Sequence, residues 1–241
     1  MAVAAWKRIE KSHGFQKLKA SLRRLIGAEL RLRVEIHVET IESGGWLFTT
    51  YGLKQDSIVY SLGVGEDISF DLSIIDHFGA EVHAFDPTPS TIEMFSAADL
   101  PNRFQFHPWA VTAEDGTVKL YPRVRKDGRQ SAVMYTMLAE DASCENAIEV
   151  PALSLASIAA RLGHARIDLL KMDIEGAEYE VLEGLLASPI RPCQLLVEFH
   201  HRFPGIGLEM TAGMIRRLQH AGYKIFAISE TGREVSFLRT D

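Results

Sequence analysis

Two short stretches place ionisable side chains directly after apolar runs, where they could do chemistry. In the first, four charged residues fall within eight positions: Lys171, Asp173, Glu175 and Glu178. Charges at the end of a buried strand are costly unless they are paired or used. Lys171 and Asp173 are two positions apart, so a strand would turn both toward one face. We expect both to point toward a cleft or the edge of the layer, as candidate catalytic residues. Lys171 could instead pair with a strand-end carboxylate, and the two glutamates could simply favour the first turn of a helix.

The second stretch follows another apolar run and contains Glu198 and His200. A carboxylate that orients an imidazole can make it a general base. The same two side chains, together with Asp173, could instead bind a divalent metal such as Mg²⁺ through oxygen and nitrogen ligands. A histidine at a strand end can also be merely solvated, so the residues leave these alternatives open.

A glycine-containing turn follows the apolar strand predicted over residues 57–62. It contains four candidate cofactor-binding residues: Ser61, Gly63, Gly65 and Asp67. Glycines let a backbone approach a ligand closely, and an acid at the end of the next strand can accept both hydroxyls of a ribose. Asp86 has that position, 21 residues after Gly65. The unit therefore predicts binding of a nucleoside-containing cofactor.

Two further residues join this predicted site. Pro87 follows Asp86 and suits the entry to a helix, which leaves a capping role for Asp86 as the alternative. Trp109 comes after the third predicted strand and could stack on an adenine, although a tryptophan of the core would give the same pattern.

Composition limits the class of protein. The chain has 241 residues, two cysteines and a net charge of −6, which suits one large α/β domain without a disulfide framework. No apolar run approaches the ~20 residues of a membrane span. We therefore expect a cytoplasmic protein.

The charge is unevenly distributed. Residues 1–33 hold nine of the 26 Lys and Arg residues but two of the 32 Asp and Glu residues. This basic arm could bind an anionic partner, or it could be a solvated helix on an acidic body. Its apolar spacing predicts a helix over 4–27 whose face could also pair two copies of the chain.

The core alternates predicted strands and helices, which indicates one doubly wound, mostly parallel sheet. We expect strands at 30–40, 57–62, 81–86, 104–111, 118–121, 147–153, 167–172, 194–200, 223–229 and 234–239. We expect helices at 67–78, 89–98, 155–163 and 208–221, and another that follows strand 167–172 and ends at about 187. Asp115-Gly116 predicts a hairpin between strands 104–111 and 118–121. The last two strands are too close for a helical crossover, so they must be antiparallel. We divide the chain into an extension, 1–44, and a core domain, 45–241.

Several motifs resemble those of one known family. Residues 167–178, Ile-Asp-Leu-Leu-Lys-Met-Asp-Ile-Glu-Gly-Ala-Glu, are similar to the signature of the FkbM family of S-adenosylmethionine-dependent methyltransferases. Residues 59–70 and Phe85-Asp-Pro-Thr88 resemble its cofactor motifs. The resemblance implies a seven-stranded, Rossmann-like class I methyltransferase fold with strand order 3-2-1-4-5-7-6.

The resemblance also implies a function. The activity would be O-methylation of a hydroxyl on a sugar, a glycan or another small natural product. Gly63 and Gly65 would approach the methionine part of S-adenosylmethionine, Asp86 would hold the ribose, and Asp173 would lie beside the transferred methyl. A base is needed for the hydroxyl proton, and His200 or Asp173 could provide it, with Glu198 orienting His200.

The chain departs from the family pattern at the glycine turn, where the usual acid before the first glycine is missing and Ser61 is near its place. Three rival functions remain. A nicotinamide-dependent oxidoreductase would want a third glycine where Ile68 stands. A catalytically silent scaffold could act through the basic arm, and a nucleic-acid methyltransferase could use that arm to contact phosphates.

Overall fold

The computed structural model describes residues 22–23, 25, 27–124, 130–137, 146–203 and 205–240. A seven-stranded sheet in the order β12-β13-β11-β10-β3-β4-β5 forms its centre. Its parallel strands are β3 (Ile58–Leu62), β4 (Glu81–Phe85), β5 (Phe104–His107), β10 (Leu169–Met172) and β11 (Gln194–Glu198). The antiparallel strands are β12 (Tyr223–Ile228) and β13 (Glu234–Arg239). The expectation of an α/β fold with a large, mostly parallel sheet is confirmed.

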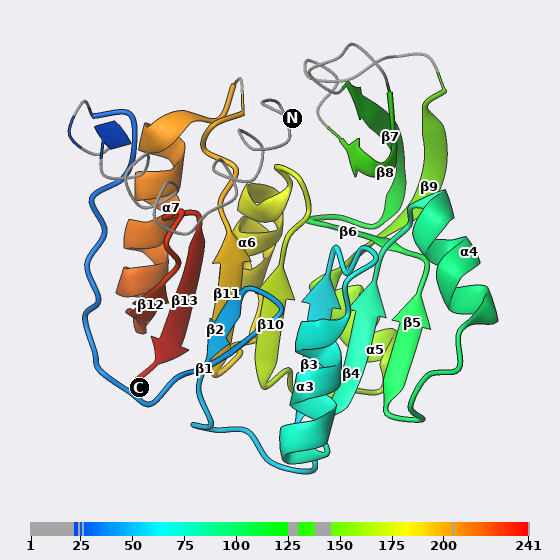
Figure 1. Cartoon of the computed structure of the whole chain (residues 1–241), viewed down its shortest axis with the longest axis horizontal. Helices are drawn as coiled ribbons and strands as arrows, with labels where there is room; N and C mark the ends of the chain where they lie inside the picture. Colours follow the sequence, from blue (N-terminus) through cyan, green and yellow to red (C-terminus); the bar gives the residue numbers. More distant parts are fainter. Residues whose placement is uncertain are drawn as a thin grey trace, which may run out of the picture.

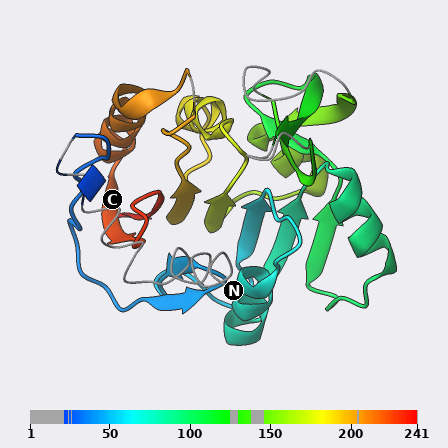
Figure 2. The same cartoon turned by 45° about the horizontal axis from the view of Figure 1, so that its top comes forward.

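Helices cover both faces of this sheet because successive strand residues alternate between two apolar clusters. Tyr60 and Leu170 belong to one cluster, whereas Val59 and Leu169 belong to the other. The helices are α3 (Ser69–Phe78), α4 (Pro89–Ala97), α5 (Leu155–Leu162), α6 (Glu178–Ala187) and α7 (Gly207–His220). Figure 2 shows α6 and α7 on one side of the sheet, and on the other side α3 with the hairpin of β1 (Ile41–Ser43) and β2 (Trp46–Phe48).

Local sequence sets the helix ends. The hydroxyl of Ser154 accepts a hydrogen bond from the Ser157 amide and so caps the start of α5. Gly163 ends the same helix with a left-handed φ of 74°, and Gly79 ends α3 with a φ of 63°. These ends fix where the following strands enter the sheet.

A second, four-stranded sheet has the order β6-β9-β7-β8. It consists of β6 (Ala110–Thr112), β7 (Gly116–Val124), β8 (Gln130–Thr136) and β9 (Ile148–Ser154). The predicted hairpin across Asp115-Gly116 is wrong, because β9 lies between β6 and β7. The single strand expected at 104–111 is also broken, at Pro108, which has no N–H to donate. In Figure 1, β7 and β8 stand above the carboxyl ends of β4 and β5.

The strand expected at 30–40 does not form. This segment is extended beside β12, where the amides of Glu35 and Ile36 both donate to the carbonyl of Ile225. Most of the helix expected at 4–27, and with it most of the basic arm, lies outside the described residues. Among the residues that are described, no helix has the length and apolarity needed to cross a membrane.

Candidate active site

A cavity of about 370 Å³ opens at the carboxyl ends of β3, β4 and β10. The parallel strands bring distant parts of the sequence to this edge of the sheet. Among the residues predicted from the sequence, those that line the cavity are Gly63, Gly65, Asp67, Asp86, Pro87, Trp109 and Asp173. Ser61, Lys171, Glu198 and His200 do not line it.

The glycine turn forms the floor of the cavity and tolerates no side chain at its first glycine. Gly63 has a φ of 68°, and a Cβ built there would stand 1.7 Å from the carbonyl oxygen of Asp173. Gly65 also has a left-handed φ, 58°, but a Cβ there would meet nothing within 4 Å. The turn is thus packed on β10 at Gly63 and open at Gly65, where a ligand can approach the backbone.

Asp86 fixes the turn from the next strand. Its Oδ2 accepts a hydrogen bond of 2.9 Å from the Gly65 amide, and its Oδ1 accepts one of 2.9 Å from the Thr88 amide. A carboxylate has about four acceptor positions, so two remain for a ligand. Asp67 is similarly held at the start of α3, where its Oδ1 accepts a hydrogen bond from the Ser69 amide at 3.0 Å.

Trp109 presents its ring to the cavity from the segment between β5 and β6. The ring stacks on His107 with centroids 4.7 Å apart, and the guanidinium of Arg161 lies 4.9 Å from its centroid. These contacts hold the ring in place, so it offers a fixed aromatic surface. The stacking of an adenine on this surface stays a prediction.

The opposite wall comes from the second sheet, and the sequence did not point to it. Leu120 of β7 and three residues at the end of β8 line it: Tyr135, Thr136 and Met137. The hydroxyl of Thr136 donates to the carbonyl of Glu175 at 2.9 Å and so ties this wall to the loop after β10. No local motif marks these residues, because their place depends on the pairing of β8 with β7.

Glu178 organises the loop after β10. Its fully buried carboxylate accepts hydrogen bonds from the amides of Ile174, at 3.0 Å, and Gly176, at 3.1 Å. The same carboxylate lies 2.9 Å from Nδ1 of His200. Glu198 is 3.8 Å from the other ring nitrogen and pairs with Arg233 instead. Glu178, rather than Glu198, therefore orients His200.

His200 is surrounded by carboxylates. Its Nε2 lies 3.6 Å from Glu175 and 3.8 Å from Asp173. Burial alone would lower the pKa of His200, but the hydrogen bond to Glu178 and the charges of Glu178, Glu175 and Glu198 raise it to about 9. The imidazole is thus protonated at neutral pH, and this state conflicts with its expected role as proton acceptor.

Asp173 and Glu175 are the two carboxylates of this cluster that line the cavity, and Asp173 has a third of its side chain exposed, whereas Glu175 is paired with Arg123 at 2.7 Å. Burial raises its pKa, although Lys171 and His200 act in the opposite direction. Burial and the charge of Asp173 likewise raise the pKa of Glu198 to about 8. Ligand atoms of Asp173, Glu178 and His200 lie within 4.8 Å of one another, so Glu178 takes the place of Glu198 in the metal set expected from the sequence.

Lys171 and Ser61 lie on neighbouring strands, side by side in register, and both are buried. The Lys171 ammonium is 3.5 Å from the Gly63 carbonyl oxygen and 5.0 Å from the centroid of Trp46. Trp46 belongs to the apolar cluster that contains α3, so Lys171 points to that face of the sheet. The expectation that it faces the cleft beside Asp173 is wrong.

Comparison with known proteins supports these motifs. The profile of the methyltransferase FkbM domain matches residues 57–225. "Probable methyltransferase-like protein 24" is 26% identical over 195 residues in Homo sapiens and 28% identical over 200 residues in Rattus norvegicus. Each alignment covers 76% of this chain and 46% of the relative. The chain thus spans about half the length of these curated relatives.

The solved structures share a lower sequence identity with this chain than these relatives do. Methyltransferase FkbM from Methylobacillus flagellatus KT has 14% identity and a TM-score of 0.45, over 77% of this chain and 44% of that one. Aeropyrum pernix fibrillarin in complex with natively bound S-adenosyl-L-methionine has 11% identity and a TM-score of 0.40, over 80% and 69%. The assignment depends on the domain profile, which matches well over half of the chain. This chain belongs to the FkbM methyltransferase family.

Proposed function

We propose that the protein transfers a methyl group from S-adenosylmethionine to a hydroxyl of a small acceptor, such as a sugar, a glycan or another natural product. One observation supports this most directly. A single cavity brings together the glycine turn, Asp86 and Asp173, which come from three different strands of the sheet.

The residues around the cavity fit this cofactor. Asp86 keeps acceptor positions for ribose hydroxyls, and Gly65 leaves space for a close approach to its backbone. The volume of about 370 Å³ falls within the range of roughly 300–1,000 Å³ that is usual for small-molecule sites. When bound, S-adenosylmethionine supplies a methyl group that its sulfonium makes electrophilic.

The side chains near the cavity can align and deprotonate an acceptor. A hydroxyl must lose its proton as it attacks. Asp173 is the base that we propose, because it lines the cavity and burial raises its pKa, whereas Glu175 is paired with Arg123. His200, already protonated, balances the surrounding negative charge at 3.8 Å from Asp173. It therefore acts as a positioning residue, and Glu178 holds it in place.

Calorimetric titration with S-adenosylmethionine and S-adenosylhomocysteine tests the cofactor, with NAD(H) as the control. We expect micromolar binding of the sulfur nucleosides, and Asp86→Ala should weaken it sharply. A folded protein that binds neither compound would overturn the proposal and favour a non-catalytic scaffold.

Transfer of labelled methyl to pools of hydroxyl compounds tests the acceptor class. Asp173→Asn should abolish turnover while cofactor affinity changes by no more than a few-fold. His200→Gln should reduce turnover less and shift its pH profile, because it acts through Asp173. Label found in nucleic acid but in no small hydroxyl compound would contradict the acceptor class and direct attention to the basic arm at 1–33.

A metal-assisted reaction would give a different result when metal is removed. It would use Asp173 and His200 with Glu178 or Glu198 to hold Mg²⁺. A chelator should then abolish turnover and added Mg²⁺ should restore it. Turnover that a chelator leaves unchanged would exclude this version.

A further inference from the structure

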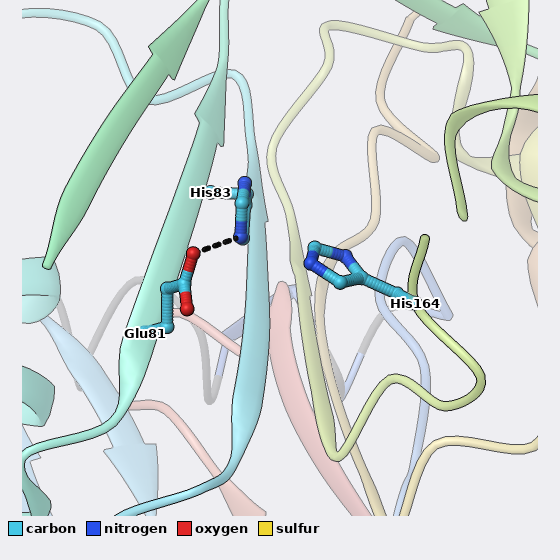
Figure 3. Close-up of side chains that lie close together, drawn as sticks. All are labelled: Glu81, His83 and His164. Atoms are coloured by element: carbon cyan, nitrogen blue, oxygen red, sulfur yellow. Dashed lines mark ion pairs between the residues drawn. The ribbon is translucent and has the colours of Figure 1, made fainter. Parts of the chain in front are cut away.

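A second group of ionisable side chains lies on the same sheet but away from the cavity. Glu81 and His83 are on β4, and His164 lies in the loop after α5 (Figure 3). Glu81 begins the strand that ends beside Asp86, so the two acids are about 16 Å apart along the chain direction. None of the three side chains lines the cavity, and the function proposed above does not use them.

The three side chains converge on one point. One ligand atom of each lies within 4.8 Å of the other two. Figure 3 shows the ring of His164 directed toward His83 and Glu81. His83 Nε2 is 3.1 Å from Glu81 Oε1, close to the roughly 3.3 Å that separates two ligands of a tetrahedral zinc.

His83 Nε2 also needs a partner. The side chain is buried, at 4% exposure, and this nitrogen makes no hydrogen bond despite its short distance from Glu81. Buried polar atoms without a partner are rare because each costs free energy. A metal ion at this point would satisfy the nitrogen.

The other ring nitrogens are already held. His83 Nδ1 is 3.0 Å from Nε2 of His107, and His164 Nδ1 is 2.8 Å from the hydroxyl of Tyr60. Metal-binding histidines usually donate their second N–H to such a partner, which fixes the tautomer and the ring orientation. Both rings are thus arranged with Nε2 available for a metal.

A simple ion pair between His83 and Glu81 is the competing explanation. An ion pair accounts for the two side chains of β4 but not for the third, His164, whose ring meets His83 edge-on at 4.5 Å between centroids and whose ligand atom lies within 4.8 Å of both others. The Glu81 side chain is 43% exposed, so an ion has a path from solvent.

We propose that Glu81, His83 and His164 form a binding site for Zn²⁺ or a similar transition metal, with one position left for water. Two imidazoles and one carboxylate suit zinc, whereas Mg²⁺ and Ca²⁺ prefer oxygen ligands. A metal here would join β4 to the loop after α5. The site would lie at the amino end of the sheet, away from the cavity proposed for methyl transfer.

Zinc titration of the chelator-stripped protein by calorimetry tests this site, with thermal unfolding as a second measurement. We expect one equivalent of Zn²⁺ to bind with micromolar affinity or better and to raise Tm, while Mg²⁺ has no effect. His164→Gln and Glu81→Gln should each weaken zinc binding at least 100-fold. Both side chains are partly exposed, so these variants should fold even if a variant of buried His83 does not. His77→Gln, an exposed histidine on α3, is the matched control.

Variants of Tyr60, which contacts His164, and of His200, in the other cluster, sharpen the test. Tyr60→Phe should weaken zinc binding by about 10- to 100-fold because His164 loses its partner. His200→Gln should leave zinc binding unchanged. Absence of zinc binding, equal binding by wild type and His164→Gln, or loss of binding in His200→Gln would each overturn the proposal.

Discussion

The two ends of the central sheet each hold a buried histidine near a carboxylate, yet one of these histidines is protonated and the other is neutral. The pKa of His200 at the carboxyl end is raised to about 9, whereas that of His83 at the amino end is lowered to about 3. Burial lowers the pKa in both cases. Burial alone therefore does not determine whether a histidine of this protein carries a proton.

The neighbours make the difference. Around His200 lie the carboxylates of Glu178, Glu175, Asp173 and Glu198, all within 4 Å. His83 has Glu81 on one side, but its ring stacks on His107 and meets His164 edge-on at 4.5 Å between centroids. Four neighbouring carboxylates stabilise a cation at His200, whereas the neighbouring imidazoles disfavour a proton on His83.

Removing one carboxylate from each end should give the largest contrast. Glu178→Ala leaves a buried cation without its main partner and frees the amides of Ile174 and Gly176, so we expect a loss of about 3–5 kcal/mol in the free energy of unfolding. In the metal-free protein, Glu81→Ala removes a half-exposed group, and the expected loss is below about 1 kcal/mol. Urea denaturation of both variants measures the difference. Equal losses would contradict the view that the carboxyl end depends on its charges.

The glycine turn gives a contrast within the carboxyl end itself. Gly63→Ala would push a methyl group into the Asp173 backbone, and we expect about 1–3 kcal/mol of destabilisation together with loss of cofactor binding. Gly65→Ala has a similar φ but open space around it, so it should fold more stably than Gly63→Ala. Thermal unfolding and cofactor titration compare the pair. Similar stability of the two variants would show that the backbone of β10 can move away.

The pH dependence of stability should also separate the two histidines. His200 binds a proton more tightly in the folded than in the unfolded protein, so its contribution is complete below pH 6.5 and is lost as the pH rises toward 9. His83 binds its proton more weakly when folded, so stability falls as the pH drops from 6.5 toward 3. Each slope can reach about 1.4 kcal/mol per pH unit.

Urea unfolding at several pH values measures these slopes in the wild type, His200→Gln and His83→Gln. His200→Gln should lose the decrease in stability above pH 6.5, and His83→Gln should lose the decrease below pH 6.5. Each variant should keep the other decrease. Glu198, whose pKa is raised to about 8, titrates in the same range and interacts with His200, so the change in His200→Gln reports the two groups together. A variant that loses both decreases would show that the two ends are coupled.

Much of the sheet could be predicted because its determinants are local. Glycines end α3 and α5, and buried strands such as β10 are continuous apolar runs. The second sheet was mispredicted because the insertion of β9 between β6 and β7 is a long-range pairing that no turn motif encodes. The wall formed by Tyr135 and Met137 was missed for the same reason.

The candidate site shows the same division. Asp86 and the glycines could be found from spacing, since a βαβ unit brings them together. The prediction that Lys171 shares a face with Asp173 was wrong. It assumed that both residues belong to one strand, but β10 ends at Met172, so the alternation of side chains does not extend to Asp173. The pairing of Glu178 with His200 could not be predicted, since it depends on how the loop after β10 folds back onto β11.

The smallest predicted effect comes from backbone strain at Glu175, in the loop after β10. Glu175 has a left-handed φ of 52°, which costs a non-glycine residue about 1–2 kcal/mol. Glu175→Gly relieves this strain but loses the 2.7 Å ion pair with Arg123 and adds freedom to the unfolded chain. We expect the free energy of unfolding to change by less than about 1 kcal/mol, while turnover falls because the loop that carries Asp173 loosens. Asn146→Gly, at a φ of 65° and exposed, is the matched control that should keep full turnover. If Glu175→Gly lowers the free energy of unfolding by much more than this amount, the ion pair with Arg123 contributes more to stability than the backbone strain at Glu175 costs.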